Sequence, residues 1–120
     1  AMRTQQDAET LFTLGLLAKR EGRYKLAENY YQSAIWEDPT FSECMNNLAN
    51  VYLLTKDEAP DRVTLARIWY RKALKIKPNK AEFYYNLGRS YPPLDPQRVK
   101  YLVKARVLNP HLVDRLSKLT

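Results

Sequence analysis

Three stretches of the chain repeat one spacing of apolar, small and proline residues, and this repeat constrains the fold more than any other feature. Leu14 and Leu48 occupy equivalent places 34 positions apart, and Leu87 occupies the same place in the third stretch. Repetition at this period is typical of stacked helix–turn–helix units. The shared positions are Leu11, Leu14, Gly15, Ala27, Tyr31, Ala34 and Pro39; Met45, Leu48, Ala49, Ala66, Tyr70, Ala73 and Pro78; and Tyr84, Leu87, Gly88, Leu102, Ala105 and Pro110.

Small and large residues have different roles in this pattern. A small residue such as Gly15 or Gly88 lets the first helix of a unit approach the second closely. The large residues that fill the remaining space are Leu14, Leu48, Leu87, Tyr31, Tyr70 and Leu102. Each proline disfavours helix in the residue before it, so the second helix of every unit ends there. One helix pair cannot bury both of its faces, and the units are therefore expected to stack.

This pattern resembles the tetratricopeptide repeat family over residues 8–110. The resemblance implies an all-α fold, an α-solenoid in which antiparallel helix pairs form a right-handed superhelix. We predict about seven helices, over 7–20, 24–37, 42–54, 62–76, 80–91, 95–108 and 110–119. The whole chain, 1–120, is predicted to be one domain. Its units would be 8–41, 42–80 with a loop insertion, 81–110, and a final helix over 111–120.

Three residues near the predicted helix ends carry more specific expectations. Asp61 and Asp95 are predicted N-caps, and Pro96 suits the first position of the following helix. Arg98 stands where the first two units have alanine, which predicts less close packing in the third pair. The last segment places Leu112, Leu116 and Leu119 on one face. That face fits either a capping helix or the first helix of a further repeat.

Composition and motifs argue against catalysis. There is no phosphate-binding glycine loop, no nucleophile elbow and no metal-spaced cluster of histidine and cysteine, so we predict a non-enzymatic protein without cofactors or metals. Cys44 is the single cysteine and His111 the single histidine. No apolar run approaches the length of a membrane span. We expect a cytoplasmic location. Ala1 before Met2 is typical of a cloning remnant, which suggests a domain cut from a longer chain.

The resemblance implies a site on the concave surface, because the first helices of such units line it. The residue just before the Leu-Gly or Leu-Ala pair would face inward, which selects Thr13, Asn47 and Asn86. Peptide-binding members of the family often have asparagine at this position. A carboxamide can donate to and accept from the backbone of an extended peptide, which holds the peptide without reading its side chains.

Neighbouring positions complete the predicted site. They are Asn46, Asn50, Arg89, Phe12, Leu16 and Tyr85, with Glu9, Glu43, Glu82, Arg20 and Leu54 on the same face. Phe12, Leu16 and Tyr85 would offer apolar contacts, and Arg89 would bind a carboxylate. The predicted partner is a protein or peptide segment. The alternative is that Asn47 and Asn86 are merely polar residues on a solvated face.

Other partners rank lower. The two-carboxylate clamp that holds chaperone C-terminal tails would need lysine at 12 and 82, asparagine at 16 and 47, and arginine at 86. Of these only Asn47 matches, so we do not expect a chaperone tail to bind in that way.

The net charge of +7 leaves nucleic acid as an alternative, through Arg67, Arg71, Lys72 and Lys75, although such a stripe is more often a solvated helix face. We interpret Trp36, Trp69, Tyr30 and Tyr101 as packing residues. Self-association through the terminal helices is a further alternative.

Overall fold

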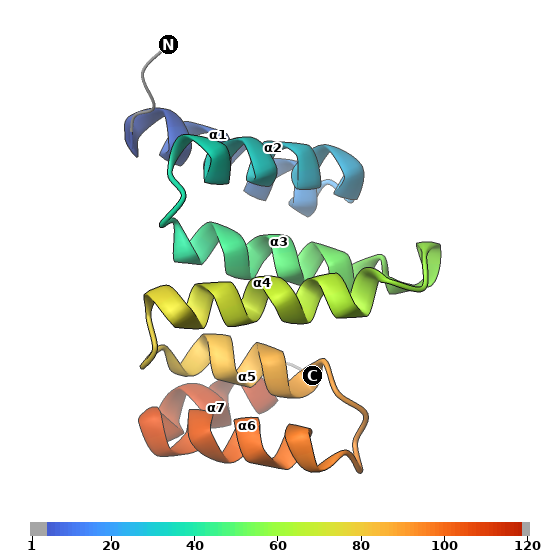
Figure 1. Ribbon diagram of the computed structural model, residues 1–120, viewed down its shortest axis with the longest axis vertical. Coiled ribbons are helices and arrows are strands. Elements are labelled where there is room, and N and C mark those ends of the chain that lie inside the picture. Colours follow the sequence, from blue (N-terminus) through green and yellow to red (C-terminus); the bar gives the residue numbers. More distant parts are fainter. Residues whose placement is uncertain (1–4, 119–120) are drawn as a thin grey trace.

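The computed structural model describes residues 5–118, which form a stack of antiparallel helices (Figure 1). The helices are α1 (Gln5–Arg20), α2 (Tyr24–Glu37), α3 (Ser42–Leu54), the short 3₁₀ helix η1 (Lys56–Glu58), α4 (Arg62–Ile76), α5 (Ala81–Arg89), α6 (Pro96–Leu108) and α7 (Pro110–Ser117). Residues 5–118 contain no strand. The all-α prediction is confirmed, and most helix ends lie within two residues of the predicted ones. In the described range, no helix has the length and apolar character needed to cross a membrane.

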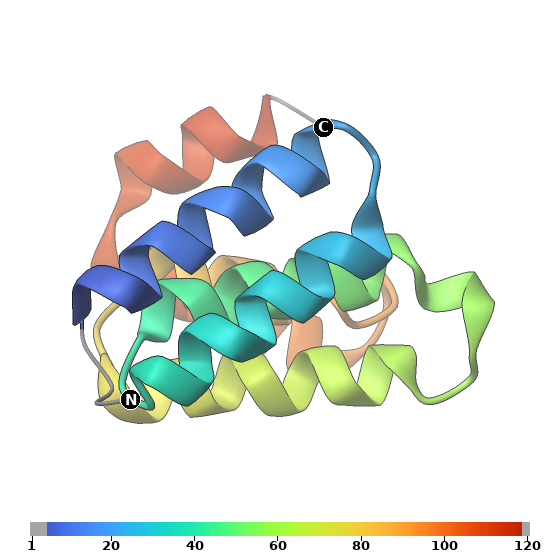
Figure 2. The ribbon, with the colours of Figure 1, turned by 90° about the horizontal axis from the view of Figure 1, so that it is seen from above.

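Consecutive helices pair and the pairs stack, α1 with α2, α3 with α4, and α5 with α6. The stack measures 45 × 30 × 23 Å. Viewed along its long axis, α1 and α7 lie on one side and α4 on the other, with α3 and α5 between them (Figure 2). We call the side of α1, α3, α5 and α7 the inner face, and the side of α2 and α4 the outer face.

The core follows the small-against-large contacts that the repeat predicts. Tyr31 and Tyr70 are completely buried, and Leu48 and Leu87 are buried between the pairs. A Cβ atom placed on Gly15 would lie 2.4 Å from Cε1 of Tyr31, so only glycine fits against that ring. The expectation that Leu14 fills the interior is wrong, because its side chain is 38% exposed. Leu14 belongs to the first pair in the stack, which lacks the neighbouring pair that covers the equivalent leucines.

The predicted caps have different outcomes. Asp95 caps α6, because its Oδ1 accepts from the backbone N–H of Gln97 at 2.8 Å, and Pro96 follows at the first helical position. Asp61 is the N-cap residue of α4, as predicted, but its side chain makes no capping bond. Arg98 does not separate α5 from α6. Its guanidinium turns to the end of α5 and donates to the carbonyl of Tyr91 at 2.9 Å.

Helix α7 packs against both α5 and α6. Val113 joins Tyr85 and Ala105 in a small buried cluster, with Leu112 and Leu116 on the packed side of α7 and half-buried. Leu119 lies outside the described residues. This packing suits a capping helix and equally the first helix of another repeat, so that choice stays open.

Candidate functional site

The inner face contains a cavity of about 340 Å³ between three stacked helix pairs. We call it the central cavity. Its walls include Lys19 from α1, Asn50 and Leu54 from α3, Tyr70 from α4, and Asn86 and Arg89 from α5. Four of these six side chains carry amide or cationic groups, and three of the four, Asn50, Asn86 and Arg89, are predicted site residues. The cavity therefore offers hydrogen-bond donors and positive charge beside apolar surface.

Asn47 and Asn86, the two predicted backbone-reading residues, are both half-buried. The Nδ2 atom of Asn47 donates to the carbonyl of Glu43 at 2.9 Å, within its own helix. The Nδ2 atom of Asn86 donates to Oδ1 of Asn46 at 3.0 Å, across two helices. A carboxamide has two N–H donors and one acceptor oxygen. Each side chain therefore keeps one N–H and its carbonyl oxygen for a ligand, in a position fixed by the first bond.

Asn46 and Asn50 have structural partners instead. Asn46 is only 1% exposed, so its side chain does not reach the surface of the inner face, and it holds Asn86 through a hydrogen bond. Asn50 is half-buried and accepts a short hydrogen bond from the hydroxyl of Tyr70. Asn50 still lines the central cavity. Of the three asparagines on α3, Asn46 is buried, whereas Asn47 and Asn50 are half-buried and both keep amide N–H groups for a ligand.

The three apolar residues predicted for the site contribute mostly to packing. Phe12 packs against the rings of Tyr31 and Phe41, with centroids 5.8 and 5.0 Å away. Leu16 is half-buried against the same core. Tyr85 is 5% exposed and covered by α7, which leaves little of its ring for a ligand. Thr13 is exposed, and its hydroxyl donates to the carbonyl of Glu9 at 3.0 Å.

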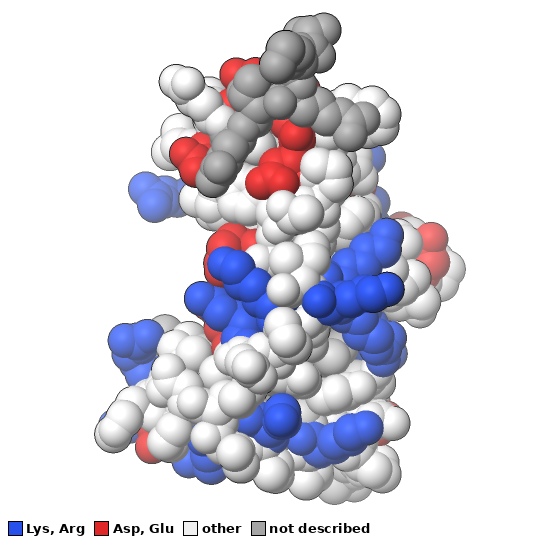
Figure 3. Space-filling view, turned by 60° about the vertical axis from the view of Figure 1, so that its left-hand side comes forward, with Lys and Arg blue, Asp and Glu red and all other residues white. Residues whose placement is uncertain are grey.

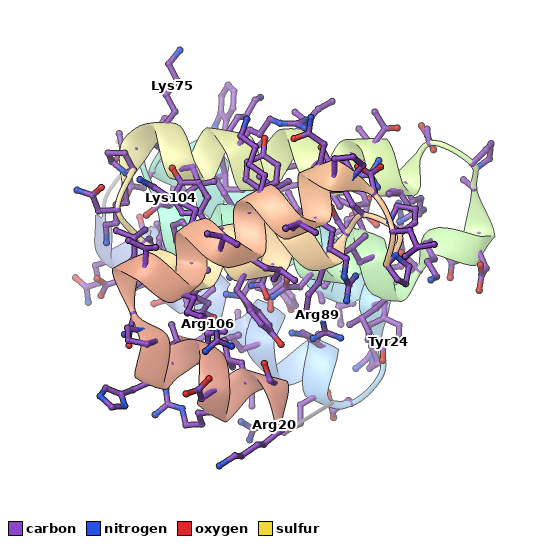
Figure 4. All side chains as sticks on the ribbon, turned by 90° about the horizontal axis from the view of Figure 1, so that it is seen from below. Arg20, Tyr24, Lys75, Arg89, Lys104 and Arg106 are labelled. Atoms are coloured by element: carbon purple, nitrogen blue, oxygen red, sulfur yellow. The ribbon has the colours of Figure 1, made fainter. Side chains whose placement is uncertain are left out.

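Charge is unevenly distributed along the stack. Glu43 forms ion pairs with Lys77 and Lys80 at 3.8 and 3.4 Å, so its charge is partly neutralised. On the side shown in Figure 3, acidic side chains gather near the first helix pair, and groups of Lys and Arg lie among uncharged residues in the middle and lower parts. Arg89 and Arg20 extend towards the inner face, and Lys75 extends from the opposite side (Figure 4). Arg89 also lies over the ring of Tyr85, 5.5 Å from its centroid.

Lys19 is a cavity residue that the sequence prediction missed. Burial lowers the pKa of its ammonium group, and the nearby carboxylate of Glu82 opposes that shift. A signal was present, because Lys19 follows Phe12 by seven positions and so lies on the same helix stripe. The structure brings it to Asn86 and Arg89, two helices away along the stack.

The outer face departs from the sequence interpretation at two places. Trp36 is 66% exposed, so interpreting it as a packing residue is wrong, whereas Trp69, Tyr30 and Tyr101 do pack against the core. The basic stripe of α4 is also interrupted. Arg67 turns away to Ser90, with its Nε donating to Oγ at 3.1 Å, and Arg71 donates to the hydroxyl of Tyr91.

Comparison with known proteins identifies the family. A tetratricopeptide repeat profile matches residues 8–41, and a TPR repeat profile matches residues 62–91. Together they cover just over half of the chain, and the chain belongs to the tetratricopeptide repeat family. Tetratricopeptide repeats form protein-interaction scaffolds, which is the class of protein that this fold and the family matches indicate. No match was found among curated proteins.

Solved structures agree with this fold. The first TPR of Spaghetti (RPAP3), bound to the HSP90 peptide SRMEEVD, is 18% identical with a TM-score of 0.82, covering 98% of this chain and 96% of that one. The Arabidopsis OM64 TPR domain is 20% identical with a TM-score of 0.80, covering 97% and 98%. MamA is 24% identical with a TM-score of 0.75, covering 92% of this chain and 63% of its own. At these identities the likeness concerns the fold alone.

Proposed function

We propose that this chain is a non-enzymatic adaptor that binds an extended segment of a partner protein along its inner face. The observation that carries this is the pair of amides Asn47 and Asn86. Each is half-buried, held by one hydrogen bond, and left with one N–H and one carbonyl oxygen. An extended peptide backbone offers a carbonyl oxygen and an N–H group, which can pair with the free N–H and the carbonyl oxygen of each amide.

The central cavity supports the same function. Leu53 and Leu54 supply apolar surface beside Asn86, and Leu54 is 54% exposed before any ligand binds. Lys19 and Arg89 add positive charge on two different helices. A segment with an apolar residue and a nearby acidic group would match this arrangement, because burial of apolar surface and charge pairing then occur together.

The partner differs from the HSP90 peptide that the Spaghetti domain binds. At the positions of the two-carboxylate clamp, Phe12 and Leu16 are committed to packing and Glu82 is acidic. The carboxylate of Glu82 would repel the carboxylates of a chaperone tail. We therefore expect the peptide SRMEEVD to bind weakly. The cytoplasmic location stays a prediction.

The alternatives have less support. Nucleic-acid binding through α4 would need a continuous basic stripe, but Arg67 and Arg71 are bonded to Ser90 and Tyr91. Self-association through α7 would need an apolar outer side, but His111, Asp114 and Arg115 are exposed there. Self-association through α1 has more in its favour, because Leu14 and Leu17 are exposed.

The test uses peptides selected from a displayed random library on the wild-type domain. Affinities are then measured for wild type, for Asn47→Ala with Asn86→Ala, and for the control Asn29→Ala with Asn79→Ala. The control removes two exposed asparagines away from the inner face. Losing the backbone contacts of Asn47 and Asn86, at about 1 kcal/mol each, should weaken binding by roughly 10- to 30-fold.

The control variant should bind as wild type does, and both variants should keep their helicity by circular dichroism. If wild type and the double variant (Asn47→Ala with Asn86→Ala) bind with equal affinity, the proposal that these two amides hold the peptide backbone is refuted. Light scattering that shows a dimer dispersed by Leu14→Glu or Leu17→Glu would favour self-association instead.

A further inference from the structure

A second cavity, of about 450 Å³, lies where the ends of α3 and α5 meet α4 and the start of α6. We call it the edge cavity. Four of its lining residues are cationic, Lys56, Arg67, Arg89 and Arg98, and no lining residue is acidic. None of the four forms a salt bridge within residues 5–118. Four cations around one cavity create a positive potential that attracts an anionic ligand.

Two of these cations are held in place by the protein. Arg67 donates through Nε to Oγ of Ser90 at 3.1 Å, and its guanidinium lies 3.9 Å from the ring centroid of Tyr91. Arg98 donates through Nη1 to the carbonyl of Tyr91 at 2.9 Å. Both arginines are half-buried. Because these contacts already restrict the two side chains, little conformational entropy remains to be lost when an anion binds.

Each held guanidinium keeps donors for a ligand. A guanidinium has five N–H groups, and Arg67 uses only those on Nε and Nη2, while Arg98 uses Nη1. The carbonyls at the end of α5 would by themselves repel an anion, because a helix C-terminus is negative. Here Arg67 and Arg98 bind those carbonyls, at Ser90 and Tyr91, and so neutralise that end.

We propose that the edge cavity binds the phosphate of a phosphorylated serine or threonine in the segment that the inner face holds. Leu53 and Arg89 line both cavities, so a segment leaving the central cavity along α3 and α5 enters the edge cavity directly. This inference rests on the proposed function, because the phosphorylated residue belongs to the segment that we propose to lie along the inner face.

Phosphate fits the edge cavity better than a carboxylate does. A phosphate ester carries about 1.5 to 2 negative charges at neutral pH, against one for a carboxylate, and binds guanidinium groups through two oxygens at once. Val63, Tyr91, Pro92 and Pro93 form the remaining walls and can contact the residues beside the phosphate. The cations also converge on one cavity instead of following a line, which favours a single anionic group over a nucleic-acid backbone.

The experiment compares three fluorescent degenerate peptide libraries that differ only in one fixed central residue: serine, phosphoserine or glutamate. Binding to the whole domain is followed by anisotropy. We expect the phosphoserine library to bind at least tenfold tighter than the serine library. Lys56→Gln with Arg67→Gln should remove most of that advantage while serine-library binding stays unchanged. The control, Lys75→Gln with Lys104→Gln, removes the same charge elsewhere and should keep the advantage.

Lys56→Gln alone is the second variant, since Lys56 is exposed and forms no salt bridge within residues 5–118. It should reduce the advantage by about threefold, in line with the energy of one exposed charge pair. Free O-phosphoserine should also shift the Arg67 and Arg98 side-chain signals in an NMR titration, and this arm does not depend on the inner-face amides.

Equal binding of the serine and phosphoserine libraries, with both weakened by Asn47→Ala and Asn86→Ala, would refute the phosphate site and leave the proposed function standing. Glutamate binding as tightly as phosphoserine would make the cavity a carboxylate site and also refute the proposal. Displacement of the phosphoserine library by single-stranded DNA, with loss in Lys56→Gln, would refute it in favour of nucleic acid.

Discussion

The first and third helix pairs share one spacing of small and large residues but differ in how tightly they pack. In the first pair, Gly15 receives the ring of Tyr31, which is fully buried. In the third pair, Gly88 faces Leu102, which is half-buried, and an added Cβ would lie 3.1 Å away instead of 2.4 Å. The repeat therefore requires a small residue opposite a large one. How closely the two helices fit at that point depends on which large residue is present.

The same two pairs also differ in their exposed surfaces. In the third pair, α5 ends at Arg89, and the other cations of the edge cavity lie around this helix end. The first pair has a cavity of similar size, about 440 Å³, but its lining residues on α2 include no cation and one acidic residue, Glu37. The turn between its helices, Glu21 to Arg23, is short. The tight first pair contributes mainly stability, whereas the looser third pair combines packing with the basic surface that we assign to binding.

The largest expected effect on stability comes from truncating the large residue that packs against the glycine in each pair. Tyr31→Ala should lower the free energy of unfolding by about 3 to 5 kcal/mol, because a fully buried aromatic ring leaves a large cavity. Leu102→Ala should cost about 2 kcal/mol, since part of its side chain is already in water. Urea unfolding followed by circular dichroism measures both values. Equal losses in the two variants would contradict the difference in tightness.

The next effect concerns the glycines. Gly15→Ala should cost roughly 1 to 2 kcal/mol, because its Cβ meets the ring of Tyr31, which has no room to move. Gly88→Ala should stay within about 1 kcal/mol of wild type, since the helix propensity gained offsets a small shift of Leu102.

A double mutant sharpens this comparison. Gly15→Ala in a Tyr31→Leu background reproduces the contact of the third pair and should cost less than Gly15→Ala alone. The same unfolding measurement is used. An unchanged cost would mean that the ring of Tyr31 is not what excludes alanine.

The smallest effect concerns the hydroxyl of Tyr31. It is buried and has no hydrogen-bond partner within the described chain, and burial, followed by the neighbouring Cys44, raises the pKa of the phenol. Removing an unsatisfied polar group should make Tyr31→Phe more stable by about 1 kcal/mol at pH 7. Tyr101→Phe, in the third pair, is the control and should change stability less, because that ring is only half-buried.

The pH dependence has a defined sign. Burial, and next the charge of Asp38, raises the pKa of the Cys44 thiol to about 12, and the Tyr31 phenol shifts in the same direction. The unfolded chain loses these protons at lower pH than the folded chain, so stability falls as pH rises above about 9. Tyr31→Phe should make that fall shallower above about pH 10. Identical pH profiles for the two proteins would contradict the assignment.

Much of the fold could be predicted from the sequence, and less of the site. Prolines and small residues act on their own or adjacent helices, so the pairs and most helix ends followed from spacing. The inner-face position of Asn47 was predicted through the resemblance, and its ligand contact stays a prediction. Asn46 is one residue away, about 100° around the helix, and its burial depends on α5 packing over α3. Tyr85 is covered only because α7 folds back on α5.

By itself, the sequence determined the local structure of this protein: which segments are helical, where they end, and which pairs approach closely. Only the tertiary structure decided which polar groups meet. Lys56, Arg67, Arg89 and Arg98 come from four different segments, η1, α4, α5 and α6. Helix period specifies a residue's face relative to its own axis, whereas stacking determines which ends of different helices converge. The edge cavity exists only because of that convergence.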